Sequence, residues 1–295
     1  MNTLTPGRIV FNLFNYFFLS VLAVLCVLPL VNVLMISFSD NAAVAAGHVK
    51  LWPIGFNTDS YRFVFHKPEF LKAFGIGLQK LLLGVAISIV LTIMVAYPLS
   101  KEPEVFRWRT PLVWFFVITM LVSGGLIPSY IIVMKTGLIN SIWALVLPGA
   151  VPVYLVVLLL NFFRSLPKEL EESAFIEGAS HWQSMWKIYV PLSLPAIATI
   201  TLFSAVSNWN DWFSGLIYMN MPEKYPLATY LQTILITLDP SQMKDTAFDV
   251  GQFKNVSLRT YKAAQIFLGA LPILLAYPFL QRFFVHGIVL GSVKE

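Results

Sequence analysis

The chain has 295 residues, of which 57% are hydrophobic and only 12% are charged, and its mean hydropathy is +0.73. These values lie far outside the range of soluble globular domains and predict an integral membrane protein. The net charge of +5 would suit a nucleic-acid binder, but the basic residues are scattered through loops without a continuous patch, so no nucleic-acid partner is expected. The single cysteine, Cys26, excludes an intramolecular disulfide.

Six apolar stretches are long enough for the ~20 residues that a helix needs to cross a bilayer. They cover about residues 11–36, 71–99, 111–134, 142–163, 192–217 and 261–284. The first is too long for the ~7 to 15 residue core of a cleaved signal peptide, so we expect it to be retained; Ala43-Val44-Ala45 leaves cleavage as an alternative. The pattern predicts one all-α polytopic domain with both termini on the same side.

Breakers interrupt two of these spans. The third contains Ser123-Gly124-Gly125 and Pro128, and the fourth contains Pro148 and Pro152. Because lipid cannot satisfy the freed backbone groups, we expect the broken part of the third span to face protein or water. Lys80 lies inside the second span, where it could line an aqueous path, contact a partner subunit or extend to the interface.

The segment 165–191, called the hairpin below, is charge-rich yet carries helix signals. Ser165 is a candidate N-cap with Pro167 in the first turn, and the acidic residues that follow suit the positive end of a helix dipole. Gly178 predicts a stop, and Ser180 with Gln183 has the spacing of a capping box. The second helix is predicted to run through Lys187 and to be interrupted at Pro191.

The hairpin also holds many large apolar side chains for a segment of its size. They are Phe175, Ile176, Trp182, Met185 and Trp186. Such a set favours a protein partner that covers it. The alternative is that these residues lie against lipid headgroups, where tryptophan is common.

The hairpin carries a recognisable spacing. Glu172-Ser173-Ala174, Gly178, Ile188 and Pro191 resemble the E-A-A, G, I-x-L-P signature of permease subunits of bacterial ABC importers, with departures at Ser173 and Val190. The stretch AAGHVKLWPIGF, at residues 45–56, resembles the oligosaccharide and polysaccharide branch, which includes the alginate, complex-sugar and maltose importers.

The resemblance implies a type I, maltose-like permease fold of six transmembrane helices in the bacterial inner membrane, with both termini cytoplasmic. The hairpin 165–191 would then be a cytoplasmic coupling helix that docks on an ATPase subunit, which agrees with the excess of basic residues in the first short loop, Lys101, Arg107 and Arg109, over Lys135 in the second. The residues expected to couple to the ATPase are Glu172, Ser173, Ala174, Gly178, Trp182, Met185, Trp186, Ile188 and Pro191.

The same resemblance implies partners. These are a related second permease subunit, two ATP-binding subunits that carry ATP and magnesium, an extracytoplasmic solute-binding protein and an oligosaccharide substrate. Residues 37–70 and 218–260 would be external loops, and the second would contact the solute-binding protein. The chain itself has no P-loop or other catalytic motif, so neither an enzyme nor a bound cofactor or metal is expected.

A polar cluster lies toward the end of the fifth span. Its candidate substrate-path residues are Asn208, Asn210, Asp211 and Trp212. Amide, carboxylate and indole groups suit a sugar, and an aromatic belt with interfacial polar residues is the equal alternative. A stand-alone secondary sugar transporter is the rival function, and it would need paired ionisable residues within the spans, where the sequence offers little beyond Lys80.

Overall fold

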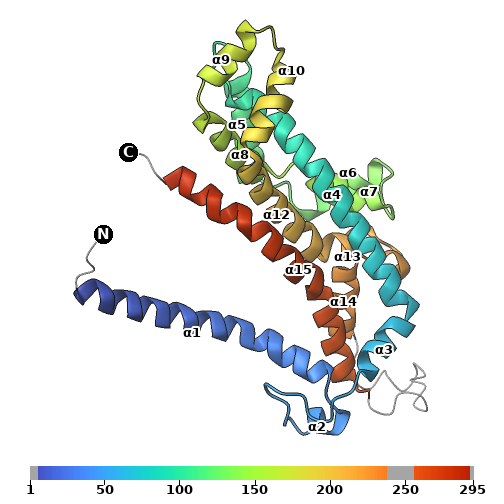
Figure 1. Ribbon diagram of the computed structural model, residues 1–295. Coiled ribbons are helices and arrows are strands. Elements are labelled where there is room, and N and C mark those ends of the chain that lie inside the picture. The colour runs from blue at the N-terminus through green and yellow to red at the C-terminus, as the bar shows by residue number, and fades with distance from the viewer. Residues whose placement is uncertain (1–5, 238–255, 293–295) are drawn as a thin grey trace. The chain divides into compact units, whose positions relative to one another are not determined.

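The computed structural model describes residues 6–237 and 256–292, and every regular element in these ranges is a helix or helical turn (Figure 1). The chain divides into two compact units, which are described separately. One contains Met1–Leu71 and Thr233–Leu271, and the other contains Lys72–Gln232 and Pro272–Glu295.

The first unit contains α1 (Pro6–Ser37), α2 (Asn41–Ala45), α3 (Asp59–His66) and the start of α15 (Leu258–Ser292). α1 is long and apolar enough to cross a bilayer. α1 thus spans the first predicted segment, and α15 contains the last; the side chains from residue 279 onward lie outside the described part.

The loop after α1 is folded, as its breakers predict. Asp40 caps α2 by accepting a hydrogen bond from the Ala42 amide at 3.1 Å. Ser39 accepts one from the Ile54 amide at 3.1 Å, and Asn32 of α1 donates to the Lys50 carbonyl at 2.7 Å. The 37–70 segment also contains α3, and α4 begins at Pro68 rather than at the predicted residue 71.

The second unit is built around α4 (Pro68–Ser100), which is one uninterrupted helix of 33 residues. Its other elements are α5 (Arg109–Leu121), α6 (Leu126–Lys135), α7 (Ile142–Val146), η1 (Leu147–Gly149), α8 (Val153–Ser165), α9 (Glu169–Ile176), α10 (His181–Ser184), η2 (Met185–Tyr189), α11 (Val190–Leu192), α12 (Leu194–Asn210), α13 (Phe213–Tyr218), η3 (Pro222–Lys224) and α14 (Leu227–Thr237). One apolar core joins α4, α8, α12 and η2 through residues that include Ile93, Leu159, Met185 and Ile200.

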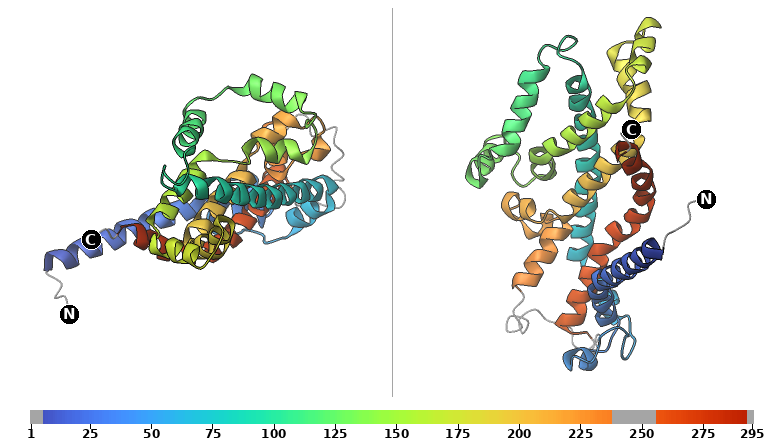
Figure 2. Two further views of the ribbon diagram at one scale, coloured as in Figure 1. Left: turned by 90° about the horizontal axis from the view of Figure 1, so that it is seen from above. Right: turned by 90° about the vertical axis from the view of Figure 1, so that its left-hand side faces the viewer.

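Two predicted spans are bent where the breakers lie: α5 and α6 meet at 115°, and the 142–149 segment and α8 at 48°. A third bend, of 82°, separates the 181–192 segment of the hairpin from α12. The change of direction between α5 and α6 is visible in Figure 2. Gly125, at φ 83°, occupies the left-handed region that this reversal requires. α14 lies within the predicted 218–260 loop, of which residues 238–255 are outside the described part.

The hairpin confirms some predicted signals and corrects two. Ser180 and Gln183 form the predicted capping box. Ser165 is wrong as an N-cap, because it ends α8 and its hydroxyl donates to the Phe162 carbonyl at 2.7 Å. Pro191 does not interrupt the second arm: helical backbone continues to Leu192, and the π turn Met185–Tyr189 precedes the proline. A π turn shifts the hydrogen-bond partners, which lets the chain pass a residue without an amide hydrogen.

Candidate functional site

The hairpin places two short helices side by side at one end of α4 (Figure 1). α9 ends at Ile176, and Gly178 adopts φ +85°, a conformation that most side chains avoid. Ser180 then begins α10 by accepting a hydrogen bond from the Gln183 amide at 3.3 Å, while Gln183 accepts one from the Ser180 amide at 2.9 Å. The turn is therefore defined by its own residues.

The signature residues do not share one environment. Glu172 and Ser173 are exposed on α9, whereas Ala174 is buried. Trp182 is 59% exposed, and Pro191 is also exposed. Met185, predicted to face a partner, is only 2% exposed and belongs to the chain's own core, against which Trp186 and Ile188 also pack. Met185 is therefore corrected from a contact residue to a core residue.

An apolar surface remains on the hairpin after this correction. Ile176 is 88% exposed, Trp182 is 59% exposed and Phe175 is 37% exposed. The Trp182 and Trp186 rings meet edge to face at 6.0 Å, and the Phe175 ring packs on His181 at 4.8 Å. These contacts hold the rings of Trp182 and Phe175 in place, so the aromatic part of the surface is preformed.

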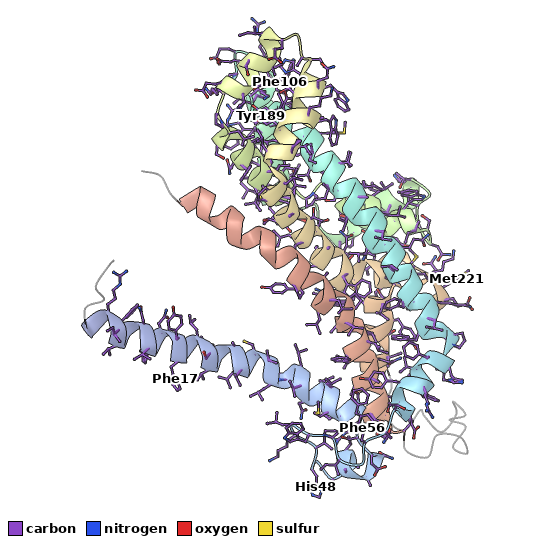
Figure 3. The ribbon with its side chains drawn as sticks, viewed as in Figure 1. Phe17, His48, Phe56, Phe106, Tyr189 and Met221 are labelled. Carbon is purple, nitrogen blue, oxygen red and sulfur yellow. The ribbon has the colours of Figure 1, made fainter. Side chains whose placement is uncertain are left out.

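Glu171 joins the hairpin to the end of α4. Its Oε1 accepts from Lys101 Nζ at 2.5 Å and from the Tyr97 hydroxyl at 3.2 Å. Its Oε2 accepts from the Tyr189 hydroxyl at 2.7 Å, so that one carboxylate ties α9 to α4 and to η2. Tyr189 and Phe106 both lie at this end of the unit (Figure 3). We call Glu171, Lys101, Tyr97 and Tyr189 the latch.

The cation of the latch lies between two aromatic rings. Lys101 Nζ is 4.0 Å from the Tyr97 ring centre and 3.9 Å from that of Tyr189, and the side chain is 7% exposed. Ring faces attract a desolvated cation, so the two tyrosines stabilise the charge that faces Glu171. A cation–π pair on each side and a carboxylate in front fix this lysine as an ion.

The acid–base properties follow from this arrangement. Burial alone would raise the pKa of Glu171, but hydrogen bonds from Lys101, Tyr189 and Tyr97 and the charge of Lys101 outweigh it and lower the pKa. Burial lowers the pKa of Lys101, although Glu171 opposes that shift. Burial and the neighbouring carboxylate raise the pKa of Tyr189 far above its usual range, so its hydroxyl remains a donor. The two shifts at the ion pair oppose each other, and the short contact favours the ionised state of both groups.

A cavity of about 320 Å³ lies further along the same unit. Its polar lining includes Ser204, Ser207, Asn208, Asp211 and Ser214, and its apolar lining includes Leu145, Pro148 and Tyr154. The mixture of amide, hydroxyl, carboxylate and apolar groups fits a polar ligand with an apolar face, such as a sugar ring.

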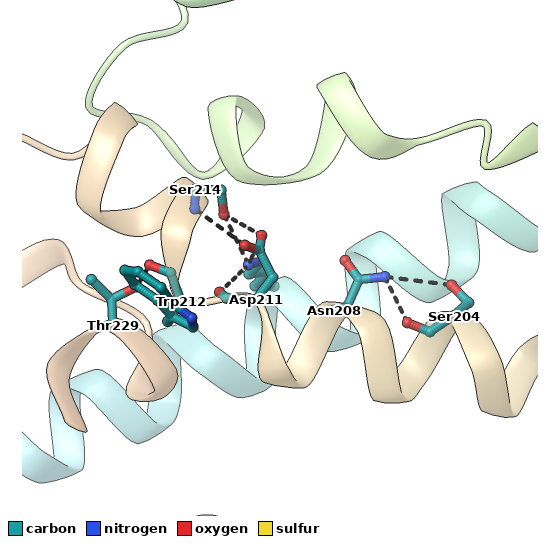
Figure 4. Close-up of polar contacts among 7 residues, drawn as sticks. Ser204, Asn208, Asp211, Trp212, Ser214 and Thr229 are labelled. Atoms are coloured by element: carbon teal, nitrogen blue, oxygen red, sulfur yellow. Dashed lines mark hydrogen bonds and ion pairs between the residues drawn. The ribbon is translucent and has the colours of Figure 1, made fainter. Parts of the chain in front are cut away.

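Two of the four candidate substrate-path residues, Asn208 and Asp211, line this cavity. The Asn208 amide donates a hydrogen bond to the Ser204 carbonyl at 2.9 Å (Figure 4). Asn210 is exposed and does not line the cavity. Trp212 does not line it either; its carbonyl accepts from the Thr229 hydroxyl at 2.7 Å. The four residues are therefore not one site. Asn208 and Asn210 are two positions apart on α12 and so lie on opposite faces of that helix.

Lys80 is paired inside the unit. Its Nζ donates to Asp211 Oδ2 at 2.7 Å, to the Asp211 carbonyl at 2.9 Å and to Ser214 Oγ at 3.1 Å. Its side chain is 1% exposed, whereas that of Asp211 is 36% exposed. The prediction that Lys80 extends to the interface is wrong, because its side chain is 1% exposed and bound to Asp211. Lys80 does not line the cavity either, although its partner Asp211 does.

Sequence reasoning missed the latch. It assigned the acidic residues of α9 only to the helix dipole, although Glu171 makes three side-chain contacts. The ion pair joins positions 70 apart, and neither residue stands in a motif that specifies the other. The one available signal was a lysine, Lys101, two positions after the apolar stretch 71–99.

Comparison with known proteins gives consistent matches. A family model described as binding-protein-dependent transport system inner membrane component matches residues 89–289. The chain is 38% identical to the polygalacturonan/rhamnogalacturonan transport system permease protein YtcP of Bacillus subtilis, over 96% of this chain and 98% of the relative. It is also 38% identical to protein LplC of B. subtilis, over 100% and 98% of the two chains.

A solved structure agrees as well. One chain of a bacterial ABC transporter involved in the import of the acidic polysaccharide alginate superposes with a TM-score of 0.87 at 28% identity, covering 96% of this chain and 100% of that chain. The fold of this chain is thus shared with a chain of a solved ABC transporter.

Proposed function

Because the chain belongs to the family of binding-protein-dependent transport system inner membrane components, we propose that it is a permease subunit of an ATP-driven importer of oligosaccharides or polysaccharide fragments. It would form one half of the translocation pathway. The substrate class is supported by the relatives that bear polysaccharide names. It is also supported by the cavity that Asn208 and Asp211 line.

The hairpin would be the point of contact with the ATPase. The observation that carries this proposal is the preformed apolar surface at the tip of the hairpin, where Ile176 is 88% exposed and Trp182 is 59% exposed. Exposed anchors of this kind, held by a defined turn, are typical of a surface that fills a partner's cleft. This surface would be framed by Glu172, Ser173, Gly178 and Pro191. It would be supported from within by Ala174, Met185, Trp186 and Ile188.

The remaining partners follow from this role. ATP and magnesium would be bound by two copies of a separate ATPase subunit, and a related permease would provide the second half of the pathway. An extracytoplasmic solute-binding protein would deliver the substrate, with the 218–260 loop as its contact. The chain would lie in the bacterial inner membrane with both termini and the hairpin in the cytoplasm.

The docking role is tested by replacing one exposed tryptophan at a time. In the complete importer, Trp182→Ser should reduce co-purification of the ATPase subunits by at least about tenfold, as expected for loss of a central interface anchor. Trp108→Ser is the matched control, because Trp108 is 69% exposed in the neighbouring loop but lies outside the hairpin. Retention of the ATPase by both variants, or its loss from both, would refute docking through this surface.

One observation favours the rival function, a stand-alone secondary sugar transporter. The ion pair Lys80–Asp211 is the kind of ionisable pair that a secondary transporter uses for ion coupling. Reconstitution distinguishes the two functions, since sugar uptake by the chain alone along an ion gradient would favour the secondary transporter. Uptake only in the presence of the ATPase and ATP would favour the importer.

A further inference from the structure

The hairpin is joined to its neighbouring spans by non-helical connections on both sides. On the α8 side, Leu166 is extended, at ψ 143°, before α9 begins at Glu169. On the α12 side, the chain bends by 82° at Ser193. Short non-helical connections can absorb a displacement in a few backbone dihedrals. Beyond these connections, the hairpin contacts α8 and α12 through the apolar core at η2, where the Tyr189 ring meets Phe163 at 5.4 Å.

The contact with α4 is of another kind. The latch carboxylate receives three hydrogen bonds, two of them from the end of α4 and the residue that follows it, and its lysine lies between two aromatic rings. Partly buried, charge-assisted hydrogen bonds are stronger and more directional than neutral contacts at the surface. α9 is therefore tied to the end of α4 by charge-assisted hydrogen bonds, whereas the contacts of the hairpin with α8 and α12 in the core are apolar.

α4 reaches from the latch to the cavity. Lys80 precedes Lys101 by 21 positions, which corresponds to roughly 30 Å of helix. At that level Lys80 binds Asp211, between α12 and α13, where Asp211 lines the cavity. Two glycines of α4 let the backbones approach closely there: a Cβ on Gly84 would overlap the Asn208 side chain, and a Cβ on Gly77 would lie 3.3 Å from Leu227.

We propose that α4 is the rigid element that carries a displacement of the hairpin to the cavity. Its two fixed ends are the ion pair Lys101–Glu171 and the ion pair Lys80–Asp211. Glu171 is then a positioning residue for transport: it contacts neither ATP nor sugar, and it determines whether movement of the hairpin moves the wall that contains Asn208 and Asp211. The proposal rests on the coupling function above, and it adds which helix transmits and which contacts hold it.

Glu171→Gln in the complete importer is the test. The variant keeps the shape of the side chain and removes the charge that holds Lys101. We expect ATPase subunits to co-purify as in the unaltered importer and ATP hydrolysis to continue. Sugar transported per ATP in proteoliposomes should fall by at least about tenfold, within the usual range of coupling between sites. Glu169→Gln is the matched control, since it removes the same charge from an exposed position of the same helix.

A second measurement reports on the far end of α4. Ser207, which lines the cavity and is exposed, is replaced by cysteine in a Cys26→Ala background, and its reaction with a polar maleimide is followed with and without ATP. ATP should change the rate by at least about fivefold when Glu171 is present, and by less than about twofold in Glu171→Gln. If Glu171→Gln changed only the rate of ATP hydrolysis, the effect of ATP on the maleimide reaction of Ser207→Cys would remain.

A double variant distinguishes loss of coupling from misfolding. Glu171→Gln leaves Lys101 without its counter-ion, and such orphaned charges destabilise proteins. Glu171→Gln with Lys101→Met removes both charges, and it should fold and assemble while remaining uncoupled in both measurements. An unchanged ratio of transport to hydrolysis in the assembled variants, or an unchanged response of the Ser207→Cys thiol to ATP, overturns the proposal. Absence of ATPase from the unaltered complex would instead refute the coupling function itself.

Discussion

The ion pair between buried Lys80 and partly exposed Asp211 predicts unequal costs for removing its two members. Asp211→Asn leaves a cation whose side chain is 1% exposed, with only the Asp211 carbonyl, Ser214 Oγ and an amide oxygen around it. Lys80→Met leaves a carboxylate that is 36% exposed and still accepts from the Ser214 amide at 3.1 Å. The aspartate substitution should therefore destabilise the protein more than the lysine substitution.

The magnitudes follow from burial. An uncompensated buried charge costs roughly 3–5 kcal/mol, which applies to Lys80 after Asp211→Asn. A partly hydrated acceptor that loses one partner costs roughly 1–3 kcal/mol, which applies to Asp211 after Lys80→Met. Lys80→Met with Asp211→Asn removes both charges and should recover most of the loss, since replacing a whole buried pair is often close to neutral.

Thermal unfolding of the purified chain in detergent measures the ranking. For Asp211→Asn we expect a fall in Tm on the order of 10 °C, a smaller fall for Lys80→Met and a Tm for the double variant near that of the unaltered protein. Lys135→Met, at an exposed lysine of α6, should change Tm little. A larger effect of Lys80→Met than of Asp211→Asn, or a double variant as unstable as the worse single one, would refute this reasoning.

Three further predictions concern single sites. Gly215→Ala should lower the free energy of unfolding by about 1–3 kcal/mol, because the added Cβ would overlap the Thr229 hydroxyl. Gly75→Ala, which has open space around the added Cβ, should not destabilise the protein in thermal unfolding, and equal effects of the two substitutions would contradict the packing. Gly178→Ala should lower the stability of the hairpin by about 1 kcal/mol because residue 178 has a φ of +85°, and Gly178→Asn should lower it less. Limited proteolysis should cleave the hairpin faster in Gly178→Ala than in Gly178→Asn, and equal cleavage would contradict this prediction. The lowered pKa of Glu171 means that the latch stabilises the fold above the unfolded-state pKa near ~4.3 and loses that contribution as pH falls through the lower folded value. Thermal unfolding between about pH 7 and pH 3 should show an acid-side loss that Glu171→Gln lacks; an identical profile for the variant would contradict this.

Much of the hairpin was readable in the sequence because its signals are local. Gly178 and the capping box Ser180–Gln183 act on residues within one turn, and both have the predicted conformation. The two local signals that failed lie at joints. Ser165 is claimed by the preceding α8, and the π turn before Pro191 lets the helical backbone continue to Leu192. Local propensity cannot decide which of two adjoining helices takes a residue at their boundary.

Burial of individual hairpin residues could not be deduced in the same way. Five large apolar side chains within twelve positions favour a partner surface, yet Met185 is buried in the core of its own unit while Ile176 is almost fully exposed. Which of them turns inward depends on tertiary packing, since Met185 meets residues of α4, α8 and α12 that lie far away in the sequence.

The sequence by itself determined a helical membrane protein, the places where its spans break and the hairpin that resembles a coupling element, because hydropathy, glycine and proline act over a few residues. Only the tertiary structure decided that Lys101 meets Glu171 across 70 positions and that Lys80 meets Asp211 across 131. A charge in an apolar span must find a partner, but the sequence does not state which one, since that choice depends on the packing of α4 against helices far along the chain.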